Sequence, residues 1–246
     1  MTYEPYTTYG ADRTARRIVT CDHAANTIPT AVNNGSLGIS ESDMNRHIAY
    51  DVGAKGVAVE LGELLNAPVI CSNFSRLVID PNRGEDDPTL LMKLYDGTII
   101  EGNRFADEAE KQRRLDLCHR PYHRAVAELA AQRDDAILVS LHSFTPQLKG
   151  RAPRPWHIGI LSAQDRRFND ALLARLNDED DLCVGDNEPY NGDLPGDSID
   201  QHALQHGRLN TLIEIRNDLI ETELNQITWA RRLAPILSAT LNDMDL

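Results

Sequence analysis

The sequence predicts an open α/β fold, with a sheet covered by helices on both faces, in one domain over residues 1–246. Short apolar segments typical of strands alternate with longer segments typical of helices, as in α/β proteins. The strand candidates are apolar almost throughout, as expected when both faces of a sheet are buried. Glycine and proline gather in short loops, and no internal repeat is present. Nothing in the chain therefore indicates a second domain.

Five short segments rich in β-branched residues predict the strands, namely residues 17–21, 68–71, 136–141, 157–161 and 212–215. Four longer segments predict the helices, namely residues 42–65, 103–133, 164–177 and 223–241. The first of these helices opens with Ser42 and Asp43 as candidate cap residues, and Pro121 interrupts the second. The acidic run 177–181 predicts a solvated loop after a helix.

The composition excludes several classes of protein. Hydrophobic residues make up 41% of the chain and charged residues 26%, which excludes a disordered or fibrous protein. The 25 Lys and Arg residues stand against 38 Asp and Glu, a net charge of −13, so no nucleic-acid partner is expected. No apolar run approaches the ~20 residues that span a bilayer. The N-terminal residues show no secretory signal, and the four cysteines form no CxxC pair, which together predict a cytoplasmic location.

Polar residues stand at the ends of three predicted strands. Asp22 and His23 follow the first strand, His142 and Ser143 follow strand 136–141, and Glu214 lies inside the last apolar run. Ligands of open α/β sheets bind beyond the carboxyl ends of the strands. Two histidines and a glutamate at this edge are typical of a mononuclear zinc hydrolase. The alternative is that the histidines only form hydrogen bonds with a nearby loop.

Two further clusters carry candidate residues. In segment 75–83, Arg76 and Arg83 flank Asp80 and Asn82, and arginine grips a carboxylate through two parallel hydrogen bonds; alternatively, these residues pin a turn. His47 and Asp51 are four residues apart in a predicted helix, so they share one face of it. They form either a surface ion pair or a metal ligand with its supporting histidine.

Six ordered stretches resemble the N-formylglutamate amidohydrolase family, namely residues 22–29, 47–54, 75–83, 141–146, 186–190 and 213–219. The resemblance runs over nearly the whole chain. It implies a distant relation to the zinc carboxypeptidases and aspartoacylase, which share a three-layer α/β/α sandwich around a mixed, mostly parallel sheet. A zinc-carboxypeptidase-like fold of this kind is therefore expected.

The resemblance also implies roles for particular residues. In the related enzymes a His-x-x-Glu motif and a second histidine bind zinc, so His23 and His142 are the expected ligands. This chain has Asn26 where the motif has glutamate, and an amide is a poor zinc ligand beside a carboxylate. Asp51 is the chosen third ligand, with Asp22 and Asn26 as the alternatives.

The expected reaction is zinc-dependent hydrolysis of an N-acyl amino acid such as N-formyl-L-glutamate, which releases formate and the amino acid; histidine breakdown is the implied pathway. Glu214 is the expected general base, and Arg76 is expected to stabilise the oxyanion. Candidate residues for binding the small anionic substrate are Asn82, Arg83, Arg216 and Ser143.

Several alternatives remain open. Glu214 could instead form a salt bridge with Arg216. Loops 84–88 and 186–196 decide whether the enzyme takes another acyl group or amino acid. If asparagine at position 26 has abolished metal binding, the chain is instead a non-catalytic protein that binds acidic ligands.

The other histidines have weaker claims, and the oligomeric state carries no sequence signal. His119 and His123 are expected to be structural or solvent-facing, and His157 to form a wall of the pocket. His202 and His206 lie before the strand of Glu214 and have no assigned role.

Overall fold

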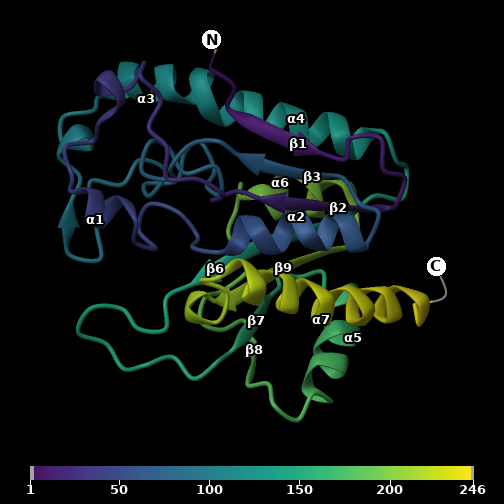
Figure 1. Ribbon diagram of the computed structural model, residues 1–246. Coiled ribbons are helices and arrows are strands. Elements are labelled where there is room, and N and C mark those ends of the chain that lie inside the picture. Colours follow the sequence, from purple (N-terminus) through teal and green to yellow (C-terminus); the bar gives the residue numbers. More distant parts are fainter. Residues whose placement is uncertain (1–2, 245–246) are drawn as a thin grey trace.

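The computed structural model describes residues 3–244 and is built around a seven-stranded sheet (Figure 1). The strand order is β1-β3-β2-β6-β9-β7-β8. The strands are β1 (Tyr6–Tyr9), β2 (Arg17–Cys21), β3 (Val69–Ser72), β6 (Ile137–Phe144), β7 (Ile158–Leu161), β8 (Val184–Asp186) and β9 (Asn210–Arg216). The pairs β1–β3 and β7–β9 are antiparallel and the other neighbours are parallel. The predicted mixed, mostly parallel sheet is confirmed.

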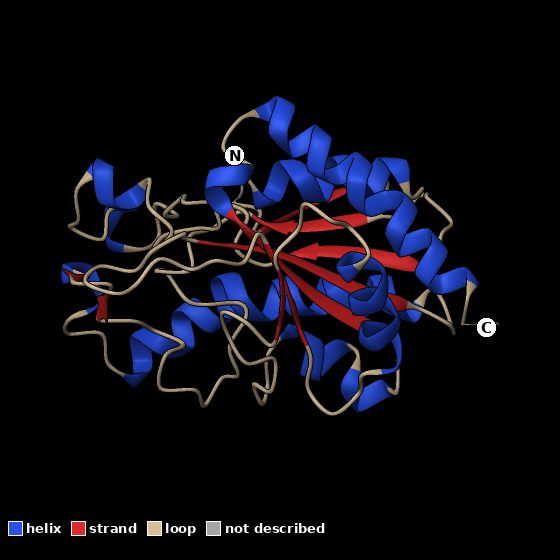
Figure 2. Cartoon of the chain, turned by 90° about the horizontal axis from the view of Figure 1, so that it is seen from below, coloured by secondary structure: helices blue, strands red, loops and turns tan. Residues whose placement is uncertain are grey.

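Helices cover both faces of this sheet (Figure 2). One layer contains α2 (Ala54–Leu64), α5 (Arg167–Asn177) and α7 (Glu223–Asn242), and the other contains α4 (Arg120–Ala131) and α6 (Ser198–His202). Side chains of a strand alternate between the two cores: Val19 and Cys21 enter the first, whereas Ile18 enters the second. This alternation requires apolar residues at consecutive strand positions, which confirms the three-layer sandwich.

The single helix predicted over residues 42–65 is wrong. The chain forms a short α1 (Glu41–Met44), capped by Ser40 instead of Ser42, and then turns until α2 begins at Ala54. Gly53 has a φ of +79°, a left-handed conformation that a helix cannot contain. His47 and Asp51 therefore lie in turns, and the argument that they share a helical face does not hold.

The helix predicted over residues 103–133 contains α3 (Glu108–Arg114), one π-helical turn (Leu115–His119) and α4. Pro121 does not interrupt it, because this proline lies in the first turn of α4 directly after the π-helical turn. A proline ring displaces the carbonyl one turn earlier, and the wider turn provides that room.

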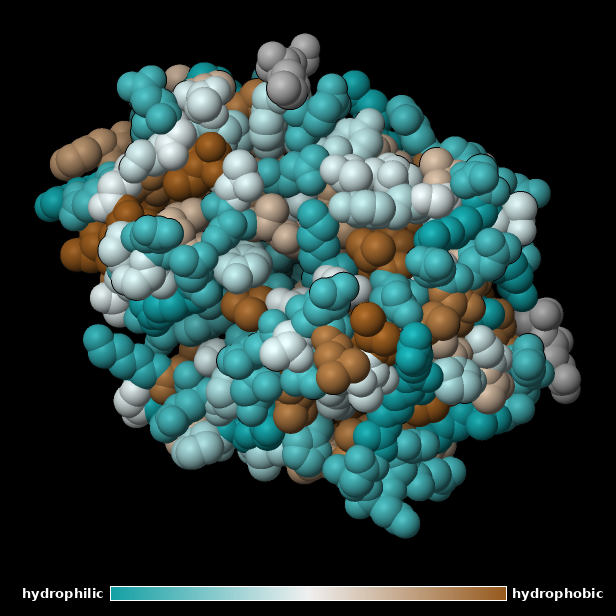
Figure 3. All heavy atoms as spheres, viewed as in Figure 1, coloured by the Kyte–Doolittle hydropathy of each residue, from teal (hydrophilic) through white to brown (hydrophobic). Residues whose placement is uncertain are grey.

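Other differences concern the strands and the surface. Strand β6 extends to Phe144, so that His142 and Ser143 lie inside the strand and not after it. The edge strands β1 and β8 and the hairpin β4–β5 (Leu94–Tyr95 and Thr98–Ile99) were not predicted. Polar residues cover much of the face in Figure 3. Within residues 3–244, no helix is long and apolar enough to cross a membrane.

Candidate active site

A cavity of about 280 Å³ brings together candidate residues from distant parts of the chain. Its walls include His23, Asp51, Arg76, Asn82, Arg83, His142, Ser143 and Glu214. The parallel strands β2, β6 and β9 are neighbours in the sheet, so their carboxyl ends open at the same edge. This arrangement makes one site out of polar residues that follow or end separate strands.

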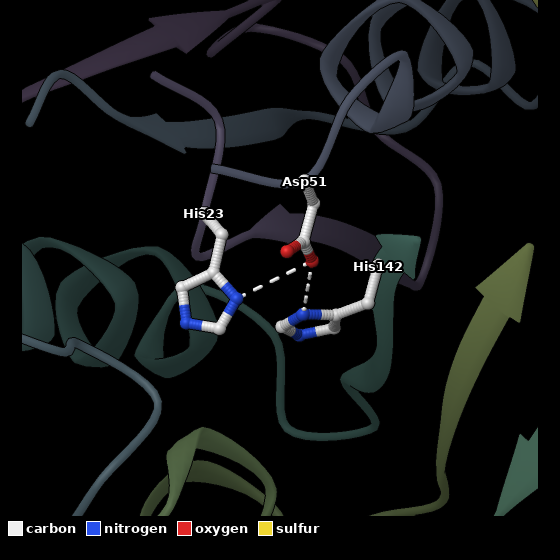
Figure 4. Close-up of side chains that lie close together, drawn as sticks. All are labelled: His23, Asp51 and His142. Carbon is white, nitrogen blue, oxygen red and sulfur yellow. Dashed lines mark hydrogen bonds and ion pairs between the residues drawn. The ribbon is translucent and has the colours of Figure 1, made fainter. Parts of the chain in front are cut away.

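Three potential metal ligands converge at the base of the cavity (Figure 4). The Nδ1 atoms of His23 and His142 lie 3.3 Å and 2.9 Å from Oδ2 of Asp51. His23 follows β2, His142 belongs to β6, and Asp51 lies in the turn before α2. All three side chains are buried, and their potential ligand atoms lie within 4.8 Å of one another.

Each histidine has a second carboxylate behind it. Nε2 of His23 lies 2.7 Å from Oδ1 of Asp80, and Nε2 of His142 lies 3.3 Å from Oδ2 of Asp22. A carboxylate only accepts hydrogen bonds, so both rings carry a proton on Nε2. The lone pair of each Nδ1 then faces Asp51. Outer carboxylates of this kind orient histidines that bind metals.

The charges at this point favour a bound cation. Two imidazole lone pairs directed at one buried carboxylate repel it unless a positive charge stands between them. Burial alone would raise the pKa of Asp51, but the two imidazoles hold it well below its usual range. Burial alone would lower the pKa of His142, but its bonds to Asp22 and Asp51 raise it instead. In the metal-free chain a proton on Nδ1 of His142 thus takes the place of the cation. The donor set of two imidazole nitrogens and one carboxylate fits zinc.

Glu214 projects from β9 into the cavity. It is 7% exposed, and its Oε2 atom has no hydrogen-bond partner within residues 3–244. Burial raises its pKa to about 7. The salt bridge to Arg216 is not formed, because Arg216 pairs with Asp218 at 2.8 Å. A carboxyl group poised near neutral pH can both accept and release a proton.

The two cavity arginines differ in their freedom. Arg76 donates from Nε and Nη2 to Asp80 and lies 3.6 Å from Asp51. Arg83 donates to Oγ1 of Thr89 and to the carbonyl of Asn82, and in the described part of the chain it forms no ion pair. Arg83 is therefore the cation available to a carboxylate in the cavity.

The structure does not bring every candidate to the site. Arg216 is outside the cavity, and His157 lines a separate hollow where its Nδ1 accepts the N–H of Cys183; the expectation that His157 forms a cavity wall is wrong. The amide of Asn26 donates to the carbonyl of Met44. Asn26 is not in the ligand cluster. The hypothesis that asparagine at this position abolishes metal binding therefore has no support.

The remaining candidate residues lie in or beside the cavity and already have protein partners. Ser143 lines the cavity, but its hydroxyl donates to the carbonyl of Val52. His47 also lines the cavity and lies 3.4 Å from Asp96. Asp22 stands behind His142, and the hydroxyl of Tyr122 donates to it.

Sequence reasoning missed the acidic cavity residue Asp197 and the role of Asp80. Asp197 caps the start of α6 and lines the cavity, and burial raises its pKa to about 7. An Asp-Ser-Ile-Asp pattern indicates a helix start, but no local signal places it against the cavity. Asp80 belongs to the motif in segment 75–83, but its contact with His23 joins residues that are 57 positions apart in the sequence.

Comparisons with known proteins agree with this geometry. A family model described as N-formylglutamate amidohydrolase matches residues 15–221. The N-formylglutamate deformylase of Pseudomonas aeruginosa is 27% identical in an alignment of 240 residues that covers 89% of this chain and 83% of that protein. The deformylase of the same name from Pseudomonas putida is 28% identical in an alignment of 207 residues that covers 75% of this chain and 73% of that protein.

Two solved structures resemble the whole chain. A gene product of Agrobacterium tumefaciens matches with a TM-score of 0.93 and 35% identity, over 99% of this chain and 97% of that one. The N-formylglutamate amidohydrolase of Ralstonia eutropha shares the fold, with a TM-score of 0.71 and 20% identity over 98% and 97% of the two chains. Because the family model matches most of the sequence, the predicted resemblance is confirmed, and the chain belongs to the N-formylglutamate amidohydrolase family.

Proposed function

We propose that the chain is a zinc-dependent amidohydrolase that removes the formyl group from an N-formyl amino acid such as N-formyl-L-glutamate, releasing formate and the amino acid. The observation that carries this proposal is the convergence of His23, Asp51 and His142 beside Glu214 in one cavity. The names of the two Pseudomonas relatives support the formyl substrate. A cytoplasmic location and a part in histidine breakdown stay predictions.

His23, Asp51 and His142 would hold the zinc, which supplies Lewis-acid activation of water near neutral pH when bound. Glu214 accepts the proton of the attacking water and passes it to the departing amine. The Nη1 atom of Arg76 lies 3.6 Å from Oδ1 of Asp51, beyond hydrogen-bond distance, and the ion pair with Asp80 does not use it, so it can donate to the oxyanion.

Arg83 holds a substrate carboxylate, and Asn82 contributes a polar wall beside it. A chain with a net charge of −13 repels anions at long range. An anionic substrate therefore depends on this local guanidinium for its affinity.

The test is a panel of N-formyl, N-acetyl and N-succinyl amino acids, assayed for amine release by protein loaded with zinc. We expect the N-formyl compounds to be hydrolysed fastest. His23→Ala and His142→Ala should each lose the metal, measured by atomic emission, together with the activity. Arg83→Gln should raise KM about tenfold or more, whereas the matched variant Arg216→Gln should change KM little. Hydrolysis of none of these compounds by zinc-loaded protein would refute the proposal.

A further inference from the structure

Three buried histidines form a cluster that the proposed mechanism does not use. His119 ends the π-helical turn, His123 lies one helical turn later in α4, and His202 ends α6. The ring centroids of His119 and His123 are 4.3 Å apart, and His123 stacks on His202 at 5.1 Å. All three side chains are buried, so their ring nitrogens need partners within the protein.

The hydrogen bonds of this cluster end on the backbone of the cavity wall. Nε2 of His123 lies 2.8 Å from the carbonyl oxygen of Pro81, and Nε2 of His119 lies 3.0 Å from that of Arg83. Carbonyl oxygens only accept, so both Nε2 atoms donate. Between these carbonyls, Oδ1 of Asn82 accepts the N–H of Ser198 at the start of α6. The π-helical turn, α4 and α6 thus hold one residue each of segment 81–83.

The proton positions in the cluster follow from these contacts. Because His123 carries its proton on Nε2, its Nδ1 accepts a hydrogen bond from Nε2 of His202, 2.8 Å away. Burial lowers the pKa of His119 and of His123, and it lowers that of His202 to about 4. All three rings are therefore neutral near pH 7. His202 and His123 form a donor chain with one direction, which ends at the carbonyl of Pro81, and His119 donates separately to the carbonyl of Arg83.

The segment that these histidines hold carries Arg83, the cavity arginine that forms no ion pair within residues 3–244. The side chain of Arg83 is anchored only to Thr89 and to the carbonyl of Asn82, as far as the described residues show. A long flexible side chain binds a carboxylate well when its backbone is already fixed, because less freedom is lost on binding. The direction of the Arg83 guanidinium thus depends on the two carbonyl hydrogen bonds.

We propose that His119 and His123 are positioning residues for recognition of the substrate carboxylate: they hold the carbonyls of Arg83 and Pro81 and thereby direct the Arg83 guanidinium into the cavity. The inference rests on the proposed function in one respect, namely that the ligand carries a carboxylate that Arg83 binds. If the histidines only pack, their loss affects every ligand alike. If they position Arg83, their loss affects the carboxylate selectively.

The experiment compares N-formyl-L-glutamate with its two monoamides, N-formyl-L-glutamine and N-formyl-L-isoglutamine. In the wild-type protein, the monoamide with the lower kcat/KM identifies the carboxylate that Arg83 binds. The ratio of kcat/KM for the dicarboxylate to that for this monoamide is the selectivity. Because both values come from one preparation, the selectivity is independent of folded fraction and zinc content.

His123→Phe keeps a ring of similar size and removes the donor. We expect the selectivity to fall about tenfold through KM, with kcat for N-formyl-L-glutamate nearly unchanged. His123→Gln places an amide donor near the position of Nε2 and should restore much of the selectivity. His206→Phe, the same substitution at an exposed histidine, should leave it unchanged. If His123→Phe does not fold, His119→Phe is measured in its place.

Combination with Arg83→Gln tests whether the residues act on one contact. The double variant His123→Phe/Arg83→Gln should show no lower selectivity than Arg83→Gln alone. The inference would be overturned if His123→Phe lowered kcat/KM equally for all three compounds or left the selectivity unchanged. It would also be overturned if the wild-type protein showed no selectivity. If the wild-type protein hydrolyses none of the compounds, the proposed function fails. The selectivity is then measured as a ratio of affinities by titration calorimetry, where His123→Phe must still lower it.

Discussion

Glu214→Gln is expected to make the metal-free protein more stable and the enzyme slower. Glu214 is buried, and its Oε2 atom lacks a partner in residues 3–244. A carboxylate in this position is unfavourable for folding, and a glutamine of the same shape carries no charge. The same carboxylate is the proposed proton acceptor. Stability and turnover should therefore change in opposite directions.

The expected gain in stability follows from the pKa of Glu214. Burial raises this pKa from the ordinary 4.5 to about 7. At 1.36 kcal/mol per pKa unit, the charged form lowers the free energy of unfolding by about 3 kcal/mol. Below pH 4.5 the carboxyl is protonated in the folded and the unfolded chain, so there is no penalty. The penalty grows as the pH rises to about 7 and is constant above that value.

The assay is chemical denaturation of wild type and variant after removal of metal, at several pH values. We expect Glu214→Gln to be more stable by up to about 3 kcal/mol above pH 7 and equal to wild type near pH 4. Glu221→Gln, the same change at an exposed glutamate, should show no such pH-dependent gain. A variant that is less stable than wild type at pH 8 would show that Glu214 has a stabilising partner and refute this part of the reasoning.

Turnover is measured on the zinc-loaded proteins. Loss of a general base typically lowers the rate about 10²–10⁴-fold, so turnover by Glu214→Gln should fall by at least about 10²-fold. Zinc content and substrate affinity should stay near those of wild type. Wild-type turnover in a folded, zinc-loaded variant would refute the proposed role of Glu214 as the base.

Three further predictions concern the proposed metal ligands and the residues that support them. Asp51→Ala should lower zinc affinity much more than Asn26→Ala, measured by competition with a chelator; the reverse order would move the third ligand to Asn26. Asp80→Asn removes the anionic acceptor behind the first histidine, so zinc affinity should fall about 10–100-fold, and an unchanged affinity would contradict this support. Tyr122→Phe removes the hydrogen bond to Oδ1 of buried Asp22, whose Oδ2 keeps its contacts with Ser140 and His142. It should lower the free energy of unfolding by about 1–3 kcal/mol in urea denaturation, and a loss near zero would contradict the bond's contribution.

The sheet could be predicted because strand signals are local. Segment 17–21 was predicted with the bounds that β2 has, and the strand around Ile213 was predicted in part. Consecutive apolar residues such as Ile18 and Val19 face opposite cores, so their pattern in the sequence already requires helices on both faces. Helix bounds were less predictable. The left-handed Gly53 fits closely against the carbonyl of Ile220, which no local pattern shows.

The candidate site could be predicted only as a list of residues. His23, His142 and Glu214 are identified by strand ends and ordered motifs, because parallel strands bring their carboxyl ends to one edge. Asp51 was chosen because it stands in an ordered motif of the family, and the helical spacing that first drew attention to it is absent from the structure. It still lies beside both histidines, because the turns before α2 and the backbone N–H of Ser143 hold it there.

The sequence by itself determined the class of fold, the family and the residue types available for chemistry, since each depends on order and composition along the chain. Tertiary structure alone decided which of these residues meet. It placed Asp80 behind His23, turned Arg216 away towards Asp218, and set the His119 and His123 rings against the segment of Arg83. The physical reason is that hydrogen bonds and ion pairs act over a few ångströms, between side chains that only folding brings together.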